Sequence, residues 1–454
     1  MNGNKNSNCP LKILLIFTIN EFRLPVVSDI PTLSNGHLGF VVFGDAILMN
    51  GLYNGQTGTS HRARIPNYSN LIEVEICFTD NCLYRMNMKQ GYFEKIINNG
   101  RNYRVHQQIY PHRFYNRAII NKITVERLEA IAPIEVILSM ATGEIPGNDT
   151  IQIDSYEIPL TSASFEKRDI IVRCFETNDI EDIFYQPEVR KFCLAHTKYP
   201  ASIKMEAVER TSEYYHITAV GDSEGSVIKE IIDVLTALKS KTLFESHTSA
   251  WEKDWNSFGI SVGGNDNLNK IIHASIFYLI SNLPSTKTNQ INGQFYGLSP
   301  SGIGKGGILY AEYQGHSFWD TEMWMLPPMT LLNPKWSEDI LSYRYMTRKA
   351  ASDNAHATGY SGYRYPWESA YTGREVTPDC CPEVVEFQHH VISDIAYAFR
   401  SHLAATHDMS WWKNVGCDIA YNTAKFWQSR AKYNETSDYY EIRSKLNIKS
   451  KILN

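Results

Sequence analysis

The sequence has little of what marks a membrane protein, a nucleic-acid-binding protein or a disulfide-rich one. Its formal net charge is −5, which gives no electrostatic reason to expect nucleic acid or a membrane surface as a partner. No apolar run reaches the roughly 18 residues that a membrane span needs. The eight cysteines show no C-x-x-C spacing, so a zinc site and a disulfide framework are both disfavoured. What remains is ordinary globular composition, with 43% hydrophobic and 20% charged residues.

Two short segments resemble known sequence signals, but each lacks part of the pattern. The apolar run at 11–19 lacks a small-residue cleavage site, so it is a weak signal-peptide candidate. We leave the compartment open and favour the cytoplasm slightly over secretion. Gly304-Lys305-Gly306-Gly307 lacks the preceding strand and the following Ser or Thr of a phosphate loop, and we expect a flexible rim there.

Aromatic residues are the first informative excess. The chain has 27 Tyr, 19 Phe and 9 Trp, and several of them cluster after residue 310. Most aromatic side chains pack in cores, and that explanation stays open here. The alternative is a carbohydrate site, because flat apolar rings complement the C–H faces of sugars while nearby carboxylates bind the hydroxyls.

The first half of the chain has the pattern of a β domain. Short runs rich in Val, Ile, Tyr and Phe are punctuated by Asn and Gly turns, which is typical of a sandwich of many short strands. We predict a β-sandwich over 28–225. The clearest strand candidates are Leu38–Phe43, Leu71–Phe78, Arg104–Tyr110, Ala118–Leu128, Ile134–Ala141 and Ser202–Val208.

The second half changes to helical spacing. A helical linker is predicted over 226–261, where Trp251 and Trp255 are four residues apart and therefore share a helix face. From 262 onward, helices alternate with long loops at 297–318 and 359–380, as in a barrel of helical hairpins. The predicted helices are Asn267–Asn282, Trp324–Leu332, Ser337–Ala350, Val384–His402 and Trp411–Ala431.

Two strings place carboxylates beside aromatic residues at loop-to-helix junctions. The first is G-H-S-F-W-D-T-E-M-W, which spans 315–324, and the second is Y-P-W-E-S-A-Y-T-G-R-E-V, which spans 365–376. This combination suits a sugar, because a ring supports one sugar face and a carboxylate accepts strong hydrogen bonds from two hydroxyls. The candidate substrate-binding residues are Phe318, Trp319, Asp320, Glu322, Trp367 and Glu368.

Each of these residues also has a purely structural explanation. Asp320 is well placed to cap the helix that starts there, and Glu368 follows a proline at another helix start. His389 and His390 are adjacent in a predicted helix, so they cannot share a face and at least one of them packs or is solvated. Spacing alone does not decide between the two explanations.

Taken together, these strings and E-F-Q-H-H-V-I-S-D-I-A-Y-A at 386–398 resemble the central domain of glycoside hydrolase family 65. Leu33-Ser34-Asn35-Gly36-His37-Leu38-Gly39 resembles the start of that family's N-terminal sandwich, so the resemblance covers roughly 28–443. The Q-H-H, Y-N-G and W-D-T-E contexts favour the branch that acts on glucosylated collagen hydroxylysine over the disaccharide phosphorylases.

The resemblance implies a fold, a reaction and a role for one carboxylate. The fold is a multidomain β plus α protein, an N-terminal β-sandwich followed by an (α/α)6 barrel. The reaction is hydrolysis of an α-glucosidic bond with inversion, and the expected substrate is the glucose of glucosylgalactosyl-hydroxylysine in collagen-type proteins. Asp320 would be the essential carboxylate that binds the glucose hydroxyls. The resemblance implies a carbohydrate partner and no metal or organic cofactor, nucleic acid or membrane.

The end of the sequence departs from the family. An inverting glycosidase needs an acid and a base, and the family's acid lies in a P-D-E-Y-H type loop shortly after a Y-E-I-R strand. Here Tyr440-Glu441-Ile442-Arg443 is followed by a Lys-, Asn- and Ile-rich segment at 444–454, which we predict to be a divergent tail. We expect 262–443 to be the first half of the barrel, with proton donor and base absent. A disaccharide phosphorylase relative and a non-catalytic sugar-binding fragment are therefore the alternative functions.

Overall fold

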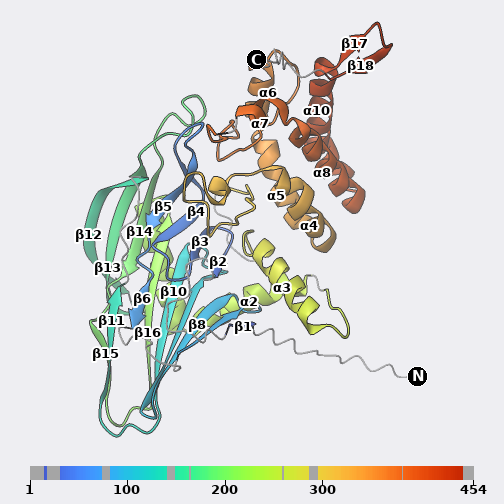
Figure 1. Ribbon diagram of the computed structural model, residues 1–454. Helices are drawn as coiled ribbons and strands as arrows, with labels where there is room; N and C mark the ends of the chain where they lie inside the picture. The colour runs from blue at the N-terminus through green and yellow to red at the C-terminus, as the bar shows by residue number, and fades with distance from the viewer. Residues whose placement is uncertain are drawn as a thin grey trace, which may run out of the picture.

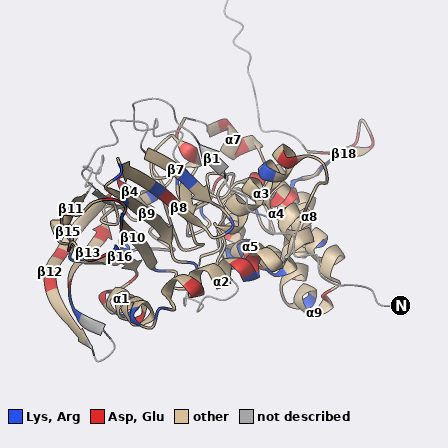
Figure 2. Cartoon of the chain, turned by 90° about the horizontal axis from the view of Figure 1, so that it is seen from below, with Lys and Arg blue, Asp and Glu red and all other residues tan. Residues whose placement is uncertain are grey.

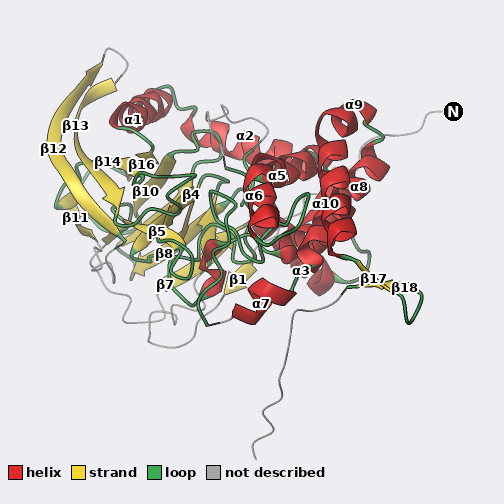
Figure 3. Ribbon diagram, turned by 90° about the horizontal axis from the view of Figure 1, so that it is seen from above, coloured by secondary structure: helices red, strands yellow, loops and turns green. Residues whose placement is uncertain are grey.

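The computed structural model describes residues 15–17, 31–73, 82–140, 149–162, 165–257, 260–285, 295–380 and 382–442. A β region comes first in the chain and a helical region follows, and the two lie side by side (Figures 1 and 3). The multidomain β plus α prediction is confirmed at that level. The predicted tail at 444–454 lies outside the described residues, and the predicted domain borders stay predictions.

The β region is built on one large antiparallel sheet. Its order is β1-β7-β8-β9-β10-β16-β14-β13-β12, and two smaller sheets have the orders β2-β3-β4-β5 and β15-β11-β6. The strands are β1 (Leu15–Phe17), β2 (Thr32–Ser34), β3 (Leu38–Val41), β4 (Ala46–Asn54), β5 (His61–Pro66), β6 (Leu71–Glu73), β7 (Cys82–Asn87), β8 (Tyr92–Asn99), β9 (Tyr103–Pro111), β10 (Ala118–Arg127), β11 (Ile134–Met140), β12 (Thr150–Ser162), β13 (Phe165–Thr177), β14 (Lys191–Thr197), β15 (Ser202–Met205) and β16 (Thr211–Gly221).

Alternation along the central strands explains why the large sheet is covered on both faces. In β10, Ile119 and Ile123 point to the side of the two smaller sheets, whereas Ala118 and Ile120 point the other way. The opposite face packs on helix α1 (Glu224–Lys239) through residues such as Ile231. The large sheet is thus the middle layer, between small sheets and a helix.

One cysteine pair corrects the sequence-based expectation. Cys174 of β13 and Cys193 of β14 are direct partners in the antiparallel register, with their Cα atoms 4.1 Å apart, and they form a disulfide. The sequence-based expectation concerned a disulfide framework and did not foresee this single bridge. A cross-strand pair depends on strand register, which no short spacing motif in the sequence reports.

Helices α2 (Leu243–Asn256) and α3 (Asp266–Ile280) connect the two regions. The prediction that Trp251 and Trp255 share a face is confirmed, because both contact α3: Trp251 stacks on Phe277 and Trp255 packs edge-on against His273. The apolar pair therefore buries α2 against the first helix of the helical region.

A buried arginine reinforces this junction. Arg113 follows β9, and its Nη2 atom lies 2.8 Å from Asp254 Oδ2 of α2, with both side chains fully buried. The same guanidinium donates to the carbonyl oxygens of Leu283 at 2.7 Å and Ile280 at 3.0 Å, at the end of α3. It therefore joins the sandwich, the linker helix and the helical region through one charged group.

The helical region continues as a series of antiparallel neighbours in which α4, α5, α8 and α10 pack together. Its elements are η2 (Glu312–Gly315), η3 (Thr321–Met325), α4 (Leu326–Leu332), α5 (Pro334–Met346), α6 (Arg348–Ala357), α7 (Pro382–Phe387), α8 (His390–Thr406), α9 (Met409–Trp411), η4 (Trp412–Gly416) and α10 (Cys417–Arg430), followed by the hairpin β17 (Lys432–Asn434) and β18 (Tyr439–Glu441). Within the described residues these are helical hairpins, and closure into a barrel stays a prediction.

The glycine-rich loop is packed rather than a flexible rim. Gly304 is buried, and a Cβ atom there would lie 2.7 Å from Thr32 Cβ of the sandwich. Arg62 of β5 donates to the carbonyl oxygens of Gly302 and Lys305. The sequence-based expectation is wrong here, because the glycines permit the close approach of the loop to the small sheet.

Charged residues and the lengths of the helices say something about possible partners. Figure 2 shows acidic and basic residues interspersed over both strands and helices. Across the described ranges, no helix combines the length and the apolar character needed to cross a membrane.

Candidate active site

Backbone hydrogen bonds bring the two predicted strings together. Ser317 N donates to Ser369 O at 2.8 Å, and Ser369 N donates to Ser317 O at 3.1 Å. These residues lie 52 positions apart in the sequence, yet they form an isolated antiparallel bridge. The carboxylates and aromatic rings of both strings therefore belong to one site, at the border between the helical region and the sandwich.

The first string is preceded by a strained backbone segment. Glu312, Tyr313 and Gln314 all have positive φ angles, of 54°, 54° and 48°, and Gly315 follows at 77°. Residues other than glycine adopt this left-handed conformation at a cost of order 1 kcal/mol or more each, and such residues cluster at functional sites. Gly315 is required because a Cβ atom would lie 2.7 Å from the Arg62 side chain.

Asp320 does not cap the helix that follows it. Its backbone is already helical at φ −57° and ψ −33°, and its side chain makes no capping hydrogen bond to η3. No salt bridge or side-chain hydrogen bond joins it to the rest of the described chain, and burial raises the pKa of its carboxyl group. A partly buried carboxylate that serves neither a cap nor an ion pair remains available for a ligand.

Aromatic rings surround the position next to Asp320. Trp319 and Trp367, one from each string, both pack edge-on against His390, with ring centroids 5.0 Å and 5.5 Å away. Phe318 packs edge-on against Trp367 at 6.2 Å. Both tryptophans are only partly buried, so ring surface remains accessible.

Glu322 is used differently from Asp320. Its side chain is 1% exposed, and Arg344 of α5 holds both of its oxygens, with Nε to Oε1 at 2.7 Å and Nη2 to Oε2 at 3.1 Å. Arg344 also donates to Phe318 O and to Ser369 Oγ, both at 3.1 Å. The pair therefore braces the two strings, and Glu322 is not exposed to a ligand in this arrangement.

Glu368 is a buried carboxyl group beside a neutral imidazole. His316 Nδ1 lies 2.8 Å from Glu368 Oε2, and burial lowers the pKa of His316 to about 3. Burial, together with the charge of Glu375, raises the pKa of Glu368 to about 8. Both groups are uncharged near pH 7, which suits a hydrogen bond rather than an ion pair in a dry pocket.

The loop of the second string is organised by carboxylates as well. Glu375 accepts hydrogen bonds from the backbone N–H groups of Trp367 at 2.8 Å and Glu368 at 3.3 Å. From the sandwich, Glu181 accepts from the N–H group of Thr372 at 2.7 Å, and burial raises the pKa of Glu181 to about 7. The sandwich therefore holds the wall of the site in place.

The structure gathers Phe318, Trp319, Asp320, Trp367 and Glu368 at one site and places Glu322 beneath them. Sequence reasoning missed Arg344 and Glu375, because neither stands out from ordinary helix and loop residues. It also did not assign separate roles to His389 and His390. In the structure the two adjacent side chains point to different places. His390 packs on the tryptophans, and His389 lines a different cavity.

The segment that carries this arrangement matches a known protein family, and the chain is similar to known proteins. Residues 290–446 match the glycosyl hydrolase family 65 central catalytic domain. The chain is 30% identical over 427 residues to a protein-glucosylgalactosylhydroxylysine glucosidase of Dictyostelium discoideum, covering 90% of this chain and 56% of that protein. It is 28% identical over 418 residues to the Gallus gallus protein of the same name, covering 91% of this chain and 57% of that one.

Phosphorylases are similar as well. A kojibiose phosphorylase of Thermoanaerobacter brockii is 34% identical over 210 residues, or 44% of this chain and 26% of that protein. Among solved structures, a putative kojibiose phosphorylase from the human microbiome superposes with a TM-score of 0.61 at 16% identity, over 90% of this chain and 58% of that one. At that identity, the similarity shows the fold alone.

The fold and the site therefore place this chain, by resemblance, beside glycosidases and phosphorylases in a group of proteins with β plus α architecture. More narrowly, it is the segment 290–446 that matches the central catalytic domain of glycoside hydrolase family 65. The chain spans a little over half the length of the glucosidases that it matches, at 56% and 57%.

Proposed function

We propose that this chain carries the glucose-binding half of an inverting α-glucosidase that removes glucose from glucosylgalactosyl-hydroxylysine. The proposal rests on one observation above the others. Asp320 has neither a capping bond nor an ion pair within the described residues. It directly follows Trp319, which shares the His390 ring with Trp367 of the second, backbone-bridged string. A glucose ring would lie against Trp319 and Trp367, and its hydroxyls would donate to Asp320.

The other residues have supporting parts in this proposal. Phe318 and Glu368 complete the wall of the pocket, and a protonated Glu368 would donate a hydrogen bond to a sugar oxygen. Glu322 acts through Arg344, so it is a positioning residue rather than a sugar ligand. The domain assignment that accompanies the proposal is a sandwich over 28–225, a linker over 226–261 and barrel helices over 262–443.

The reaction itself needs two further groups, an acid and a base. Inversion requires an acid and a base about 6.5–9.5 Å apart on opposite sides of the bond, and Asp320 is neither in our proposal. The names of the similar proteins support hydrolysis of a glucosyl-galactosyl-hydroxylysine unit. The kojibiose phosphorylases, which match about half as much of this chain, support phosphorolysis as the second candidate.

Two measurements on the chain test the proposal. Isothermal titration with glucose and with glucosylgalactosyl-hydroxylysine measures binding, with the Asp320→Asn variant as the comparison. Incubation with glucosylgalactosyl-hydroxylysine and with kojibiose, each with and without inorganic phosphate, measures turnover, and NMR identifies the anomer released. We expect glucosyl ligands to bind to the parent chain and to lose affinity in the variant.

The outcomes separate the candidates. Phosphate-independent release of β-glucose supports the inverting hydrolase, whereas phosphate-dependent release of glucose 1-phosphate supports the phosphorylase. Binding of sugar without turnover by either route is the result that a glucose-binding half without the acid and the base gives, and it is shared with the non-catalytic sugar-binding role. Equal affinity of the parent chain and Asp320→Asn for every glucosyl ligand would remove Asp320 from the site and overturn the proposal.

A further inference from the structure

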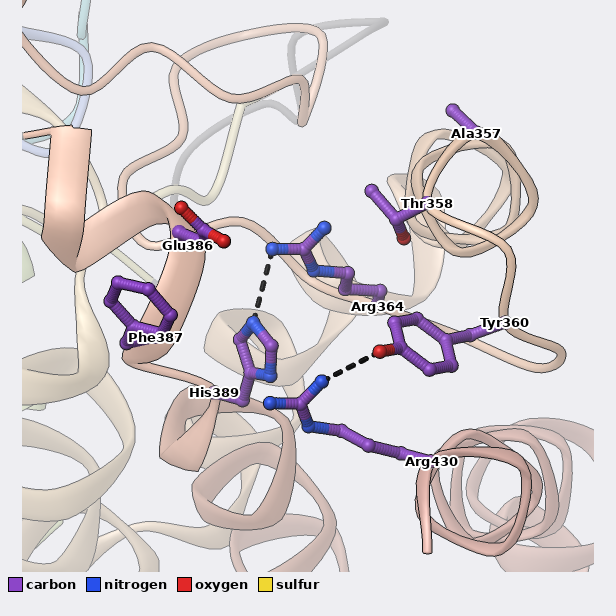
Figure 4. Close-up of a pocket in the computed structure, with 8 residues that line it drawn as sticks. All are labelled: Ala357, Thr358, Tyr360, Arg364, Glu386, Phe387, His389 and Arg430. Carbon is purple, nitrogen blue, oxygen red and sulfur yellow. Dashed lines mark hydrogen bonds between the residues drawn. The ribbon is translucent and has the colours of Figure 1, made fainter. Parts of the chain in front are cut away.

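A cavity in the helical region is lined by residues other than those of the proposed sugar site. Its volume is about 220 Å³, which is smaller than the roughly 300–1,000 Å³ typical of pockets for drug-sized ligands. It is formed where α6, the segment before the second string, α7 and the end of α10 meet (Figure 4). The residues that line it are Ala357, Thr358, Tyr360, Arg364, Glu386, Phe387, His389 and Arg430.

The cavity contains two buried guanidinium groups that have no carboxylate partner. Arg364 is 8% exposed and Arg430 is 7% exposed, yet within the described residues neither forms a salt bridge. Arg364 Nη2 contacts Val385 O at 2.9 Å and His389 Nε2 at 3.0 Å. Arg430 Nη1 donates to Tyr360 OH at 2.8 Å, and its buried Nε atom has no hydrogen-bond partner. All of these partners are neutral.

Two carboxylates act on Arg364 without pairing with it. Burial lowers the pKa of Arg364, and the negative charges of Glu375 and Glu386 partly offset that effect. Figure 4 shows the two guanidinium groups on either side of the His389 ring. Their positive charges, after burial, lower the pKa of His389 to about 4, so the imidazole stays neutral near pH 7. Glu386 also lines the cavity, but its side chain is exposed and forms no ion pair with either arginine. The cavity therefore holds two positive charges that no carboxylate contacts within the described residues, and that of Arg364 is partly offset from a distance by Glu375 and Glu386.

We propose that this cavity binds a small oxyanion, of the phosphate or carboxylate class, between Arg364 and Arg430. A buried cation without a counter-charge is costly, and an anion in the cavity would remove that cost. Guanidinium groups present planar pairs of N–H donors that match the oxygens of phosphate and carboxylate. The small volume favours an inorganic or short organic anion over a sugar.

Residues that line the cavity are close in sequence to residues of the proposed sugar site. Arg364 is three residues before Trp367, and His389 directly precedes His390, so the same two segments present one side chain to each site. An anion held by Arg364 and Arg430 would tie the second string to α10. The inference stands apart from the proposed function, because its readout is anion binding and not the cleavage of a glycoside.

Calorimetric titration of the chain with sodium phosphate, and separately with sodium sulfate and sodium acetate, tests the proposal. Sodium chloride keeps the ionic strength constant, so that screening does not change between points. We expect saturable one-to-one binding of at least one oxyanion. Arg430→Gln and Arg364→Gln should each weaken that binding by about tenfold or more, because a charge-assisted hydrogen bond is lost.

The matched control is Lys425→Gln, which removes an exposed cation from the same helix as Arg430 and should bind like the parent chain. If Arg430→Gln does not fold, Arg430→Lys is tested in its place. It keeps the charge but loses the planar donor pair, so we expect weaker but measurable binding. The proposal fails if no oxyanion binds saturably to the parent chain, or if Arg430→Gln and Lys425→Gln bind it equally well.

Discussion

The helical region buries arginine in two different ways. Arg344 lies under the proposed sugar site with both oxygens of Glu322 in contact, while Arg364 and Arg430 line the cavity with no carboxylate in contact among the described residues. All three are more than nine-tenths buried. A buried cation that is paired fixes the protein's own structure, whereas one that is unpaired keeps its charge available for a ligand.

The largest effect is expected at the paired arginine. Arg344→Met leaves Glu322 buried and unpaired, so it should cost about 3–5 kcal/mol of unfolding free energy. Denaturant unfolding followed by circular dichroism measures this loss. The double variant Arg344→Met/Glu322→Leu is the control, because it removes both charges and should recover most of the stability. If the double variant were as unstable as the single one, the ion pair would not be the cause.

A smaller effect, on ligand binding rather than folding, is expected at Asp320. Asp320→Asn preserves shape and breaks no cap, so the unfolding free energy should change by less than about 0.5 kcal/mol. Glucosyl-ligand affinity should fall by about 1.5–3 kcal/mol, since a charged acceptor is lost. Calorimetric titration and thermal unfolding of the same samples give both values. A loss of about 1 kcal/mol in stability with unchanged affinity would instead indicate a helix cap.

The pH dependence of stability is expected to change at Glu368. Because its pKa is raised from 4.5 to about 8 in the folded chain, the folded state holds a proton that the unfolded state releases between those values. This contribution is therefore present at low pH and is lost as pH rises toward 8, by up to about 1.4 kcal/mol per pH unit. Glu368→Gln should remove it, so the variant gains stability relative to the parent between pH 5 and pH 8. Parallel slopes for the two chains would show that Glu368 is already ionised.

The smallest effect is expected at the unpaired arginine. Arg430→Gln loses one hydrogen bond to the neutral Tyr360 hydroxyl and leaves no carboxylate behind, so its cost in buffer without oxyanions should be below about 1 kcal/mol. Thermal unfolding in chloride buffer measures it beside Arg344→Met. A loss as large as that of Arg344→Met would show that both arginines have the same structural role.

The sequence was informative about the order of the regions and about local pairs. Runs rich in Val, Ile, Tyr and Phe located several strands, and helical spacing located the helical segments, although the predicted helices 337–350 and 384–402 are each divided into two helices. The shared helix face of Trp251 and Trp255 follows directly from a spacing of four. These features depend on residues that are close in the chain, so they can be read from local patterns.

Features that depend on distant residues could not be read in this way. The Cys174–Cys193 bridge requires the register of two strands, and the burial of Gly304 requires the small sheet of the sandwich. Glu322 looked equivalent to Asp320 in the sequence, because nothing local shows that Arg344 of the next hairpin reaches it. The resemblance to family 65 predicted that the two strings belong to one site. It did not indicate which of their carboxylates are free to bind a ligand and which hold the structure of the site.

The contacts of Arg113 have a consequence for how the molecule unfolds. Its side chain originates in the sandwich, yet its hydrogen bonds end on Asp254 of α2 and on the carbonyl oxygens that close α3. Separating the regions would expose a guanidinium and a carboxylate that are fully buried together, in addition to the aromatic surface of Trp251. The sandwich and the first helices therefore form a single cooperative unit, and scanning calorimetry would record their melting as one heat-absorption peak instead of two.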